Sequence, residues 1–192
     1  MLVRLGQEVQ EVPRGLAAPP RLADDTIHLE PLTQADVPDM LALTGDADII
    51  RFTRVPTRAD EQFVRDWIGR YEGGWEDGSR AGFSVRGRDG AFVGFAALVD
   101  LDLERREAEL GYMVAPAARG RGVARRSVEL LTHWAFDALE LLRVELRIDV
   151  ENAPSARVAE GAGYRLEGVL RNVHFKEDSR CDLGVWSRLS SD

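Results

Sequence analysis

The feature that most constrains this chain is a strand-like run that leads directly into the glycine- and arginine-rich start of a helix. Residues 107–114 read EAELGYMV, and residues 115–131 read APAARGRGVARRSVELL. The first amide groups of a helix have no partner within it, and the helix dipole adds partial positive charge there. Gly120 and Gly122 would let an anion approach the backbone closely. Arginines add full charges at Arg119, Arg121, Arg125 and Arg126. The pattern predicts a cradle for a pyrophosphate.

Two common pyrophosphate-binding motifs do not fit this segment. A P-loop requires a Gly-Lys-Ser/Thr step, which the chain lacks. The dinucleotide fingerprint would use Gly120 and Gly122 but meets Arg125 where glycine or alanine is needed. Coenzyme A is the remaining pyrophosphate ligand common in cells. Taken alone, the segment is also compatible with a surface turn capped by arginines.

Two motifs in order carry a resemblance to a known family. Residues 119–124, R-x-x-G-x-A, resemble the acyl-CoA-binding motif [QR]-x-x-G-x-[GA] of the GCN5-related N-acetyltransferases (GNAT). Residues 143–172 resemble that family's second block, which is a strand, an asparagine, a short helix, Gly-[FY] and another strand. Its landmarks here are Asn152, Ser155, Gly163, Tyr164 and Gly168. The pair is most similar to the RimJ/RimL-like branch, which acetylates the N-termini of ribosomal proteins. The resemblance spans roughly residues 25–190 and is specific within residues 107–172.

The resemblance implies an α+β fold of the α/β/α-like GNAT type. Its central sheet is mixed and mostly antiparallel, has six to seven strands and about four flanking helices, and splays between strands 4 and 5. Hydrophobic periodicity agrees with the order β-α-α-β-β-β-α-β-α-β-β. We expect strands at residues 27–32, 81–87, 91–99, 107–114, 144–150, 164–172 and 181–189. We expect helices at residues 33–43, 58–74 and 120–139, and one after Asn152.

Length, charge and cysteine content narrow the class of protein. A chain of 192 residues suits one domain, expected at residues 25–192, after a tail or arm at residues 1–24 that ends in AAPPR. A net charge of −8 argues against nucleic-acid binding and favours a cationic acceptor such as an amine. No apolar run is long enough for a membrane span, and no signal peptide is evident. The single Cys181 fits the cytoplasm. We expect no metal and consider a homodimer.

The reaction that the resemblance implies is attack of an amine on the thioester carbonyl of an acyl-CoA. A base keeps the amine neutral, and an N–H donor stabilises the oxyanion. The family places that donor at the amide of Val114. Glu109 matches the acidic residue before Gly-Tyr in the N-terminal acetyltransferase branch, so it is the first candidate for the base. Glu107 on the same strand face or a water chain is the alternative, and Glu109 could instead be an ordinary salt-bridged carboxylate.

The leaving thiolate poses a separate question. Many relatives carry a tyrosine seven residues after the asparagine of the second block, but this chain has Ala159 there. Ser155 matches a serine that lies near the cofactor sulfur in the ribosomal-protein branch. It would hydrogen-bond the thiolate, or would simply suit the first turn of a helix. Asn152 would hold the pantetheine amides.

The resemblance thus yields a set of candidate site residues. Those expected to bind the cofactor are Met113, Val114, Arg119, Gly120, Arg121, Gly122, Val123, Ala124, Asn152 and Ser155. Those expected to line the acceptor slot, or else to pack in the core, are Phe52, Trp67, Trp75, His174 and Trp186.

We therefore expect an N-acyltransferase that moves an acetyl group from acetyl-CoA, or a related group such as succinyl, to a primary amine by direct attack. A protein or peptide N-terminus is the first expectation for the acceptor. The alternatives are a small-amine acetyltransferase and a non-catalytic CoA-binding module.

Overall fold

The computed structural model describes residues 16, 19–176 and 179–192, and the side chains of residues 174–176 and 179 are not described. Its centre is an eight-stranded sheet in the order β1-β2-β3-β4-β5-β6-β8-β7. The strands are β1 (Leu22–Ala23), β2 (Ile27–Pro31), β3 (Ala81–Gly87), β4 (Phe92–Asp102), β5 (Glu107–Val114), β6 (Arg143–Asp149), β7 (Arg165–Lys176) and β8 (Ser179–Leu189). Neighbouring strands are antiparallel except for β5 and β6.

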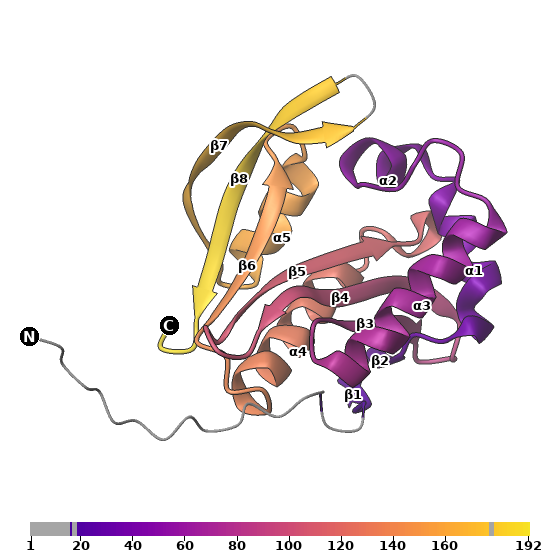
Figure 1. Cartoon of the computed structure of the whole chain (residues 1–192), viewed down its shortest axis with the longest axis horizontal. Coiled ribbons are helices and arrows are strands. Elements are labelled where there is room, and N and C mark those ends of the chain that lie inside the picture. Colours follow the sequence, from indigo (N-terminus) through magenta and orange to yellow (C-terminus); the bar gives the residue numbers. More distant parts are fainter. Residues whose placement is uncertain (1–15, 17–18, 177–178) are drawn as a thin grey trace, which may run out of the picture.

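Helices cover both faces of the sheet (Figure 1). They are α1 (Val37–Thr44), α2 (Ala47–Phe52), α3 (Glu61–Asp77), α4 (Val123–Asp137) and α5 (Ala153–Gly161). Alternation along β4 divides the core, since Phe95 and Ala97 pack with residues of α1 and α3, whereas Ala96 and Leu98 pack with residues of α4. The fold class expected from the sequence is confirmed.

The structure departs from the expected elements in three places. It has eight strands among the described residues because β1 lies inside the segment expected as a tail, where two residues show no periodicity. Helix α2 was not expected, since its six residues are too short for a helical pattern. Helix α3 continues past the expected stop at Gly73 and Gly74 and ends at Gly78, whose left-handed backbone (φ 77°) terminates it.

The splay expected in the sheet lies between β5 and β6. These parallel strands pair only from Glu107 opposite Arg143 to Glu109 opposite Glu145. Beyond that point β5 continues to Val114, and β6 continues without it. The edge of β5 that faces β6 therefore has no strand partner there, and the strands diverge as Figure 1 shows.

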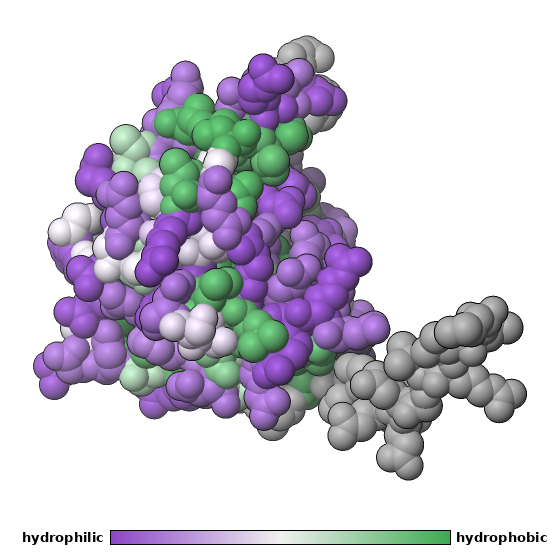
Figure 2. Space-filling model, turned by 90° about the vertical axis from the view of Figure 1, so that its left-hand side faces the viewer, coloured by the Kyte–Doolittle hydropathy of each residue, from purple (hydrophilic) through white to green (hydrophobic). Residues whose placement is uncertain are grey.

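Strand β7 forms one edge of the sheet and exposes apolar side chains. The residues concerned are Leu166, Val169, Leu170 and Val173. Figure 2, which faces the β7 side, shows separate apolar patches among polar side chains. Within the described part of the chain, no helix combines the length and apolar character needed to cross a membrane.

Candidate active site

Two cavities meet where β5 and β6 part. The first, the strand-side cavity, has a volume of about 520 Å³ and is lined mainly by the segment after α2, helix α3 and strands β4, β5 and β6. The second, the helix-side cavity, has a volume of about 600 Å³ and is lined mainly by α2, the end of β5, the start of α4 and helix α5. The residues that line both are Phe52, Thr53, Tyr112, Met113, Asn152 and Ser155. A molecule spanning both cavities would have its reacting group beside these side chains.

The start of α4 presents backbone amides to the helix-side cavity. Gly120 and Gly122 have φ angles of +73° and +78°, which glycine adopts without strain. Gly122 is the N-cap, and no side chain caps it. The first intrahelical bond runs from the amide of Arg126 to the carbonyl of Gly122. The amides of residues 123–125 therefore lack helical partners, which is the arrangement that binds phosphate groups.

Arg119 does not extend freely into the cradle. Its guanidinium pairs with Asp46, the N-cap of α2, and lies 3.0 Å from the Asp48 carboxylate. Its Nε donates to the carbonyl of Val114 at 3.3 Å. The side chain thus joins α2 to the end of β5 and shapes the wall of the cavity.

Two other arginines of this segment are also in ion pairs. Arg125 lies 2.8 Å from Glu129 one turn along α4, and Arg126 lies 3.0 Å from Asp24 beside β1. Arg121 is exposed and forms no ion pair with the described residues. Of the four arginines expected to add positive charge here, Arg119, Arg125 and Arg126 are therefore engaged by carboxylates of the chain itself.

The amide of Val114 is directed into the gap between the strands. Val114 lies opposite Gly94 on β4, and the amide of the next residue, Ala115, donates to Val93 on β4. Successive amides of a strand point to opposite edges, so the Val114 amide points away from β4. That position suits the oxyanion donor expected from the sequence.

The two hydroxyl groups at the junction of the cavities are hydrogen-bonded to each other. Tyr112 Oη donates to Ser155 Oγ at 3.0 Å. Asn152, which lines both cavities, caps α5 by accepting a bond from the Ser155 amide at 3.1 Å. Burial raises the pKa of Tyr112, against the opposing effect of its bond to Ser155. Ala159, which stands where many relatives have a tyrosine, is fully buried, and its side chain has no acidic group.

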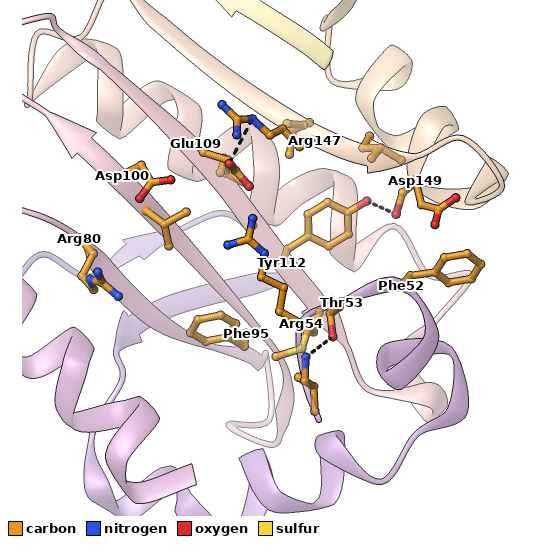
Figure 3. Close-up of a pocket in the computed structure, with 18 of the residues that line it drawn as sticks. Phe52, Thr53, Arg54, Arg80, Phe95, Asp100, Glu109, Tyr112, Arg147 and Asp149 are labelled. Atoms are coloured by element: carbon orange, nitrogen blue, oxygen red, sulfur yellow. Dashed lines mark hydrogen bonds and ion pairs between the residues drawn. The ribbon is translucent and has the colours of Figure 1, made fainter. Parts of the chain in front are cut away.

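Glu109 lies on the wall of the strand-side cavity. Its side chain is 21% exposed, and Arg147 Nε is 3.4 Å from its carboxylate. Burial raises the pKa of Glu109, while the positive charge of Arg147 lowers it. Glu107 is 42% exposed and lines neither cavity. Of the two carboxylates, only Glu109 therefore faces the strand-side cavity (Figure 3).

A family model described as "Acetyltransferase (GNAT) domain" matches residues 26–165, well over half of the chain. The chain belongs to the GNAT acetyltransferase family. It is 32% identical over 144 residues to "Putative ribosomal N-acetyltransferase YdaF" of Bacillus subtilis (strain 168), which covers 73% of this chain and 76% of that protein. It is 27% identical over 150 residues to spermidine N(1)-acetyltransferase of Escherichia coli (strain K12), covering 78% of each.

A solved structure shows the same fold as this GNAT chain. RimL, a ribosomal L7/L12 α-N-protein acetyltransferase in complex with coenzyme A, matches with a TM-score of 0.80 at 18% identity, over 90% of this chain and all of that one. The chain is thus an acetyltransferase of the GNAT type, as its sequence predicts, and the names of its relatives leave the acceptor open.

The GNAT fold brings most of the sequence-predicted cofactor residues together. All but Arg121 line the helix-side cavity, and Arg157 of α5, which sequence reasoning missed, lines it as well. Tyr112 was also missed, because a tyrosine in a strand is usually read as core. A hydroxyl partner 43 residues away is a tertiary feature.

The aromatic candidates separate into two groups. Phe52 lines both cavities and Trp67 lines the strand-side cavity. Trp75 lines neither and packs against Phe83 and Trp134 beneath the opposite face of the sheet, so its expected place in the acceptor slot is corrected. The reason is that α3 continues for another turn and carries Trp75 away from the cavity.

The remaining two candidates lie on the C-terminal strands. Trp186 on β8 is 8% exposed and belongs to the core on the α4 side. His174 is part of β7, and its side chain lies outside the described residues.

Proposed function

We propose that this chain transfers an acetyl group from acetyl-CoA to a primary amine by direct attack, without a covalent enzyme intermediate. The observation that carries the proposal is the meeting of the two cavities beside Val114, Tyr112 and Ser155. The helix-side cavity would hold acetyl-CoA, with its pyrophosphate on the amides at the start of α4. The strand-side cavity would admit the amine.

Glu109 would act as the base, directly or through a water molecule. An α-amine with a pKa near ~8 is about a tenth neutral at pH 7, and a lysine amine near ~10.4 is far less so. Because burial raises the pKa of Glu109, its carboxylate accepts a proton more readily than an exposed one. The nitrogen forms the new bond to the carbonyl carbon, and its proton passes to Glu109.

Negative charge develops on the carbonyl oxygen and on the leaving sulfur. Val114 would stabilise the first charge, and the Tyr112–Ser155 pair would stabilise the second. The Val114 amide would donate to the carbonyl oxygen as it becomes an oxyanion. As the carbon–sulfur bond breaks, Ser155 would donate its proton to the thiolate and regain one from Tyr112, which the solvent reprotonates. A lone serine is a poor proton source, and this chain has Ala159 where many relatives have a tyrosine. The bonded pair of hydroxyls would supply the proton instead.

The acceptor that we propose is the N-terminal amine of a protein or peptide, which agrees with the similarity to YdaF. A small amine is the second candidate, because the chain is also similar to a spermidine acetyltransferase. A succinyl donor, a cytoplasmic location and a homodimer stay predictions.

The test is product detection by mass spectrometry. The protein is incubated with acetyl-CoA or succinyl-CoA and with N-terminal peptides, lysine-containing blocked peptides and small amines. We expect acetylated α-amines and stoichiometric release of CoA thiol. Tight CoA binding with no acylated product from any acceptor would instead identify a non-catalytic CoA-binding module.

A further inference from the structure

The strand-side cavity contains arginines that form no ion pair with the described residues, although hydrogen bonds from Ser79 and the charge of Arg80 lower the pKa of the exposed Asp77. Those without a carboxylate oxygen within 4.0 Å are Arg54, Arg70 and Arg80. A fourth, Arg147, pairs with Glu109 and Glu145. Against these four arginines the lining has three carboxylates: Asp100, Glu109 and Asp149. Because Arg147 is neutralised by its own pair of glutamates, the positive charge offered to a ligand comes from the three arginines without an ion pair, in a chain whose net charge is −8.

Two of the unpaired arginines reach the cavity from opposite sides. Arg54 comes from the segment after α2 and extends into the middle of the cavity, toward Tyr112 and Glu109 (Figure 3). Its positive charge opposes the rise in the pKa of Glu109, which is consistent with this placement. Arg80 precedes β3 on the far side, and its guanidinium lies 5.9 Å from the centre of the Tyr71 ring. A bound molecule between them would meet two guanidinium groups.

Guanidinium groups in this arrangement select one kind of ligand. Like charges that share a cavity repel one another, and an anion relieves that repulsion. Arginine's planar fork matches the two oxygens of a carboxylate, with bonds stronger than those between neutral groups. A polyamine would add positive charge to the same space. The acidic net charge of the chain favours a cationic acceptor, but the arginine-rich lining of this cavity does not.

We propose that the amine acceptor carries a carboxylate, which Arg54 and Arg80 bind while Glu109 receives the proton of the amine. This inference rests on the proposed acyltransferase function and specifies its substrate class. The carboxylate could belong to an acidic side chain near a peptide N-terminus or to the main chain of a free amino acid. Both sources present the same group to the two arginines.

The experiment compares acceptors that differ only in that group. One arm uses peptides with Asp or Asn at the second or third position, and the other uses amino acids and their amides. Spermidine serves as the polycationic acceptor. Rates are compared at equal concentrations of neutral amine, because an amide substituent also changes the pKa of the amine. We expect kcat/KM to be about ten- to a hundredfold higher for the carboxylate member of a pair.

Variants assign the preference to the arginines. Arg54→Gln and Arg80→Gln should each reduce the ratio between carboxylate and amide acceptors about tenfold, chiefly through KM. Arg54→Lys should retain part of the ratio, since it keeps the charge and loses the fork. Arg88→Gln is the matched control: it removes the same charge from an exposed turn between β3 and β4, outside both cavities. Circular dichroism verifies that each variant is folded.

The outcomes distinguish a failure of the carboxylate preference from a failure of the transferase activity. A ratio that falls in the Arg54 and Arg80 variants and not in Arg88→Gln supports the inference, and the arm in which it appears identifies the source of the carboxylate. Equal rates for paired acceptors, a preference for spermidine, or a ratio unaffected by both substitutions would overturn it while leaving the transferase intact. No acylated product from any acceptor would overturn the proposed function, and this inference with it.

Discussion

The helix-side and strand-side cavities share six residues but are built in different ways. The helix-side cavity, which we propose binds the pyrophosphate, would use backbone amides at consecutive positions after Gly122. The strand-side cavity takes its chemistry from single side chains such as Arg54, Arg80 and Glu109, which come from separate segments. A single substitution in the backbone site would disturb several amides at once. A single substitution in the side-chain site would remove one functional group and leave the others in place.

The largest effect should come from the backbone site. Gly122→Glu places an acidic side chain in the cradle at a residue whose φ is +78°. It should weaken acetyl-CoA binding by about three orders of magnitude, since two or more bonds to the pyrophosphate, worth ~1.5–3 kcal/mol each, are lost. Calorimetric titration measures the affinity. Gly73→Glu, which adds the same charge on exposed α3, is the control and should bind normally.

The base of the strand-side cavity should give the next largest effect. Glu109→Gln should lower turnover about 10²-fold at neutral pH. The loss should shrink at high pH, where the amine deprotonates unaided. In the wild-type protein the rate should rise as the pH passes through the raised pKa of Glu109. An unchanged neutral rate would make Glu109 a structural residue and redirect the search to Glu107 or a water chain.

Stability provides an independent check on the same variant. Burial raises the pKa of Glu109 in the folded protein, so its contribution to stability is full below the unfolded pKa and is lost as the pH rises through the folded pKa. Glutamine removes that dependence, and Arg147 still has Glu145 at 2.8 Å. The melting temperature of Glu109→Gln at neutral pH should therefore be no lower than that of the wild type.

The hydroxyl pair at the junction tests whether the cavities work as one site. Ser155→Ala and Tyr112→Phe should each lower kcat about ten- to a hundredfold and leave the dissociation constant of acetyl-CoA nearly unchanged. The double variant should be no slower than the slower single variant if the two hydroxyls act in series. Tyr164→Phe is the control, because Tyr164 bonds Thr132 at 2.6 Å outside both cavities. A lower melting temperature with normal kcat would restrict the Ser155 hydroxyl to a structural role.

The smallest effect should come from the ion pair at the rim of the helix-side cavity. Asp48→Asn releases Arg119 from one of its two acidic partners. Because exposed ion pairs contribute at most ~1 kcal/mol, acetyl-CoA affinity should increase by less than about fivefold. Asp39→Asn, which removes an exposed carboxylate of α1 elsewhere, should have no effect. A decrease in affinity would show that the Asp48–Arg119 pair is needed to hold the cavity wall in place.

The same contrast explains which parts of the site could be predicted. Residues of the cradle, Val114 and Ser155 could be located because each belongs to a short motif whose spacing is set by one strand or one helix. Trp75 was misplaced because α3 continues through Gly73 and Gly74 to Gly78, and Gly74 packs so closely against Arg80 that a Cβ would lie 2.0 Å from the arginine side chain. No periodicity in the sequence indicates such a contact.

The sequence by itself determined the family and the fold class and predicted a cofactor cradle, because short motifs and hydrophobic periodicity are local properties of the chain. Only the tertiary structure decided which arginines are neutralised and which remain available. Arg119 and Arg54 look alike in the sequence, yet one pairs with Asp46 and Asp48 whereas the other enters the strand-side cavity without an ion-pair partner among the described residues. The reason is that the partner of a charged side chain is set by residues far away in the sequence.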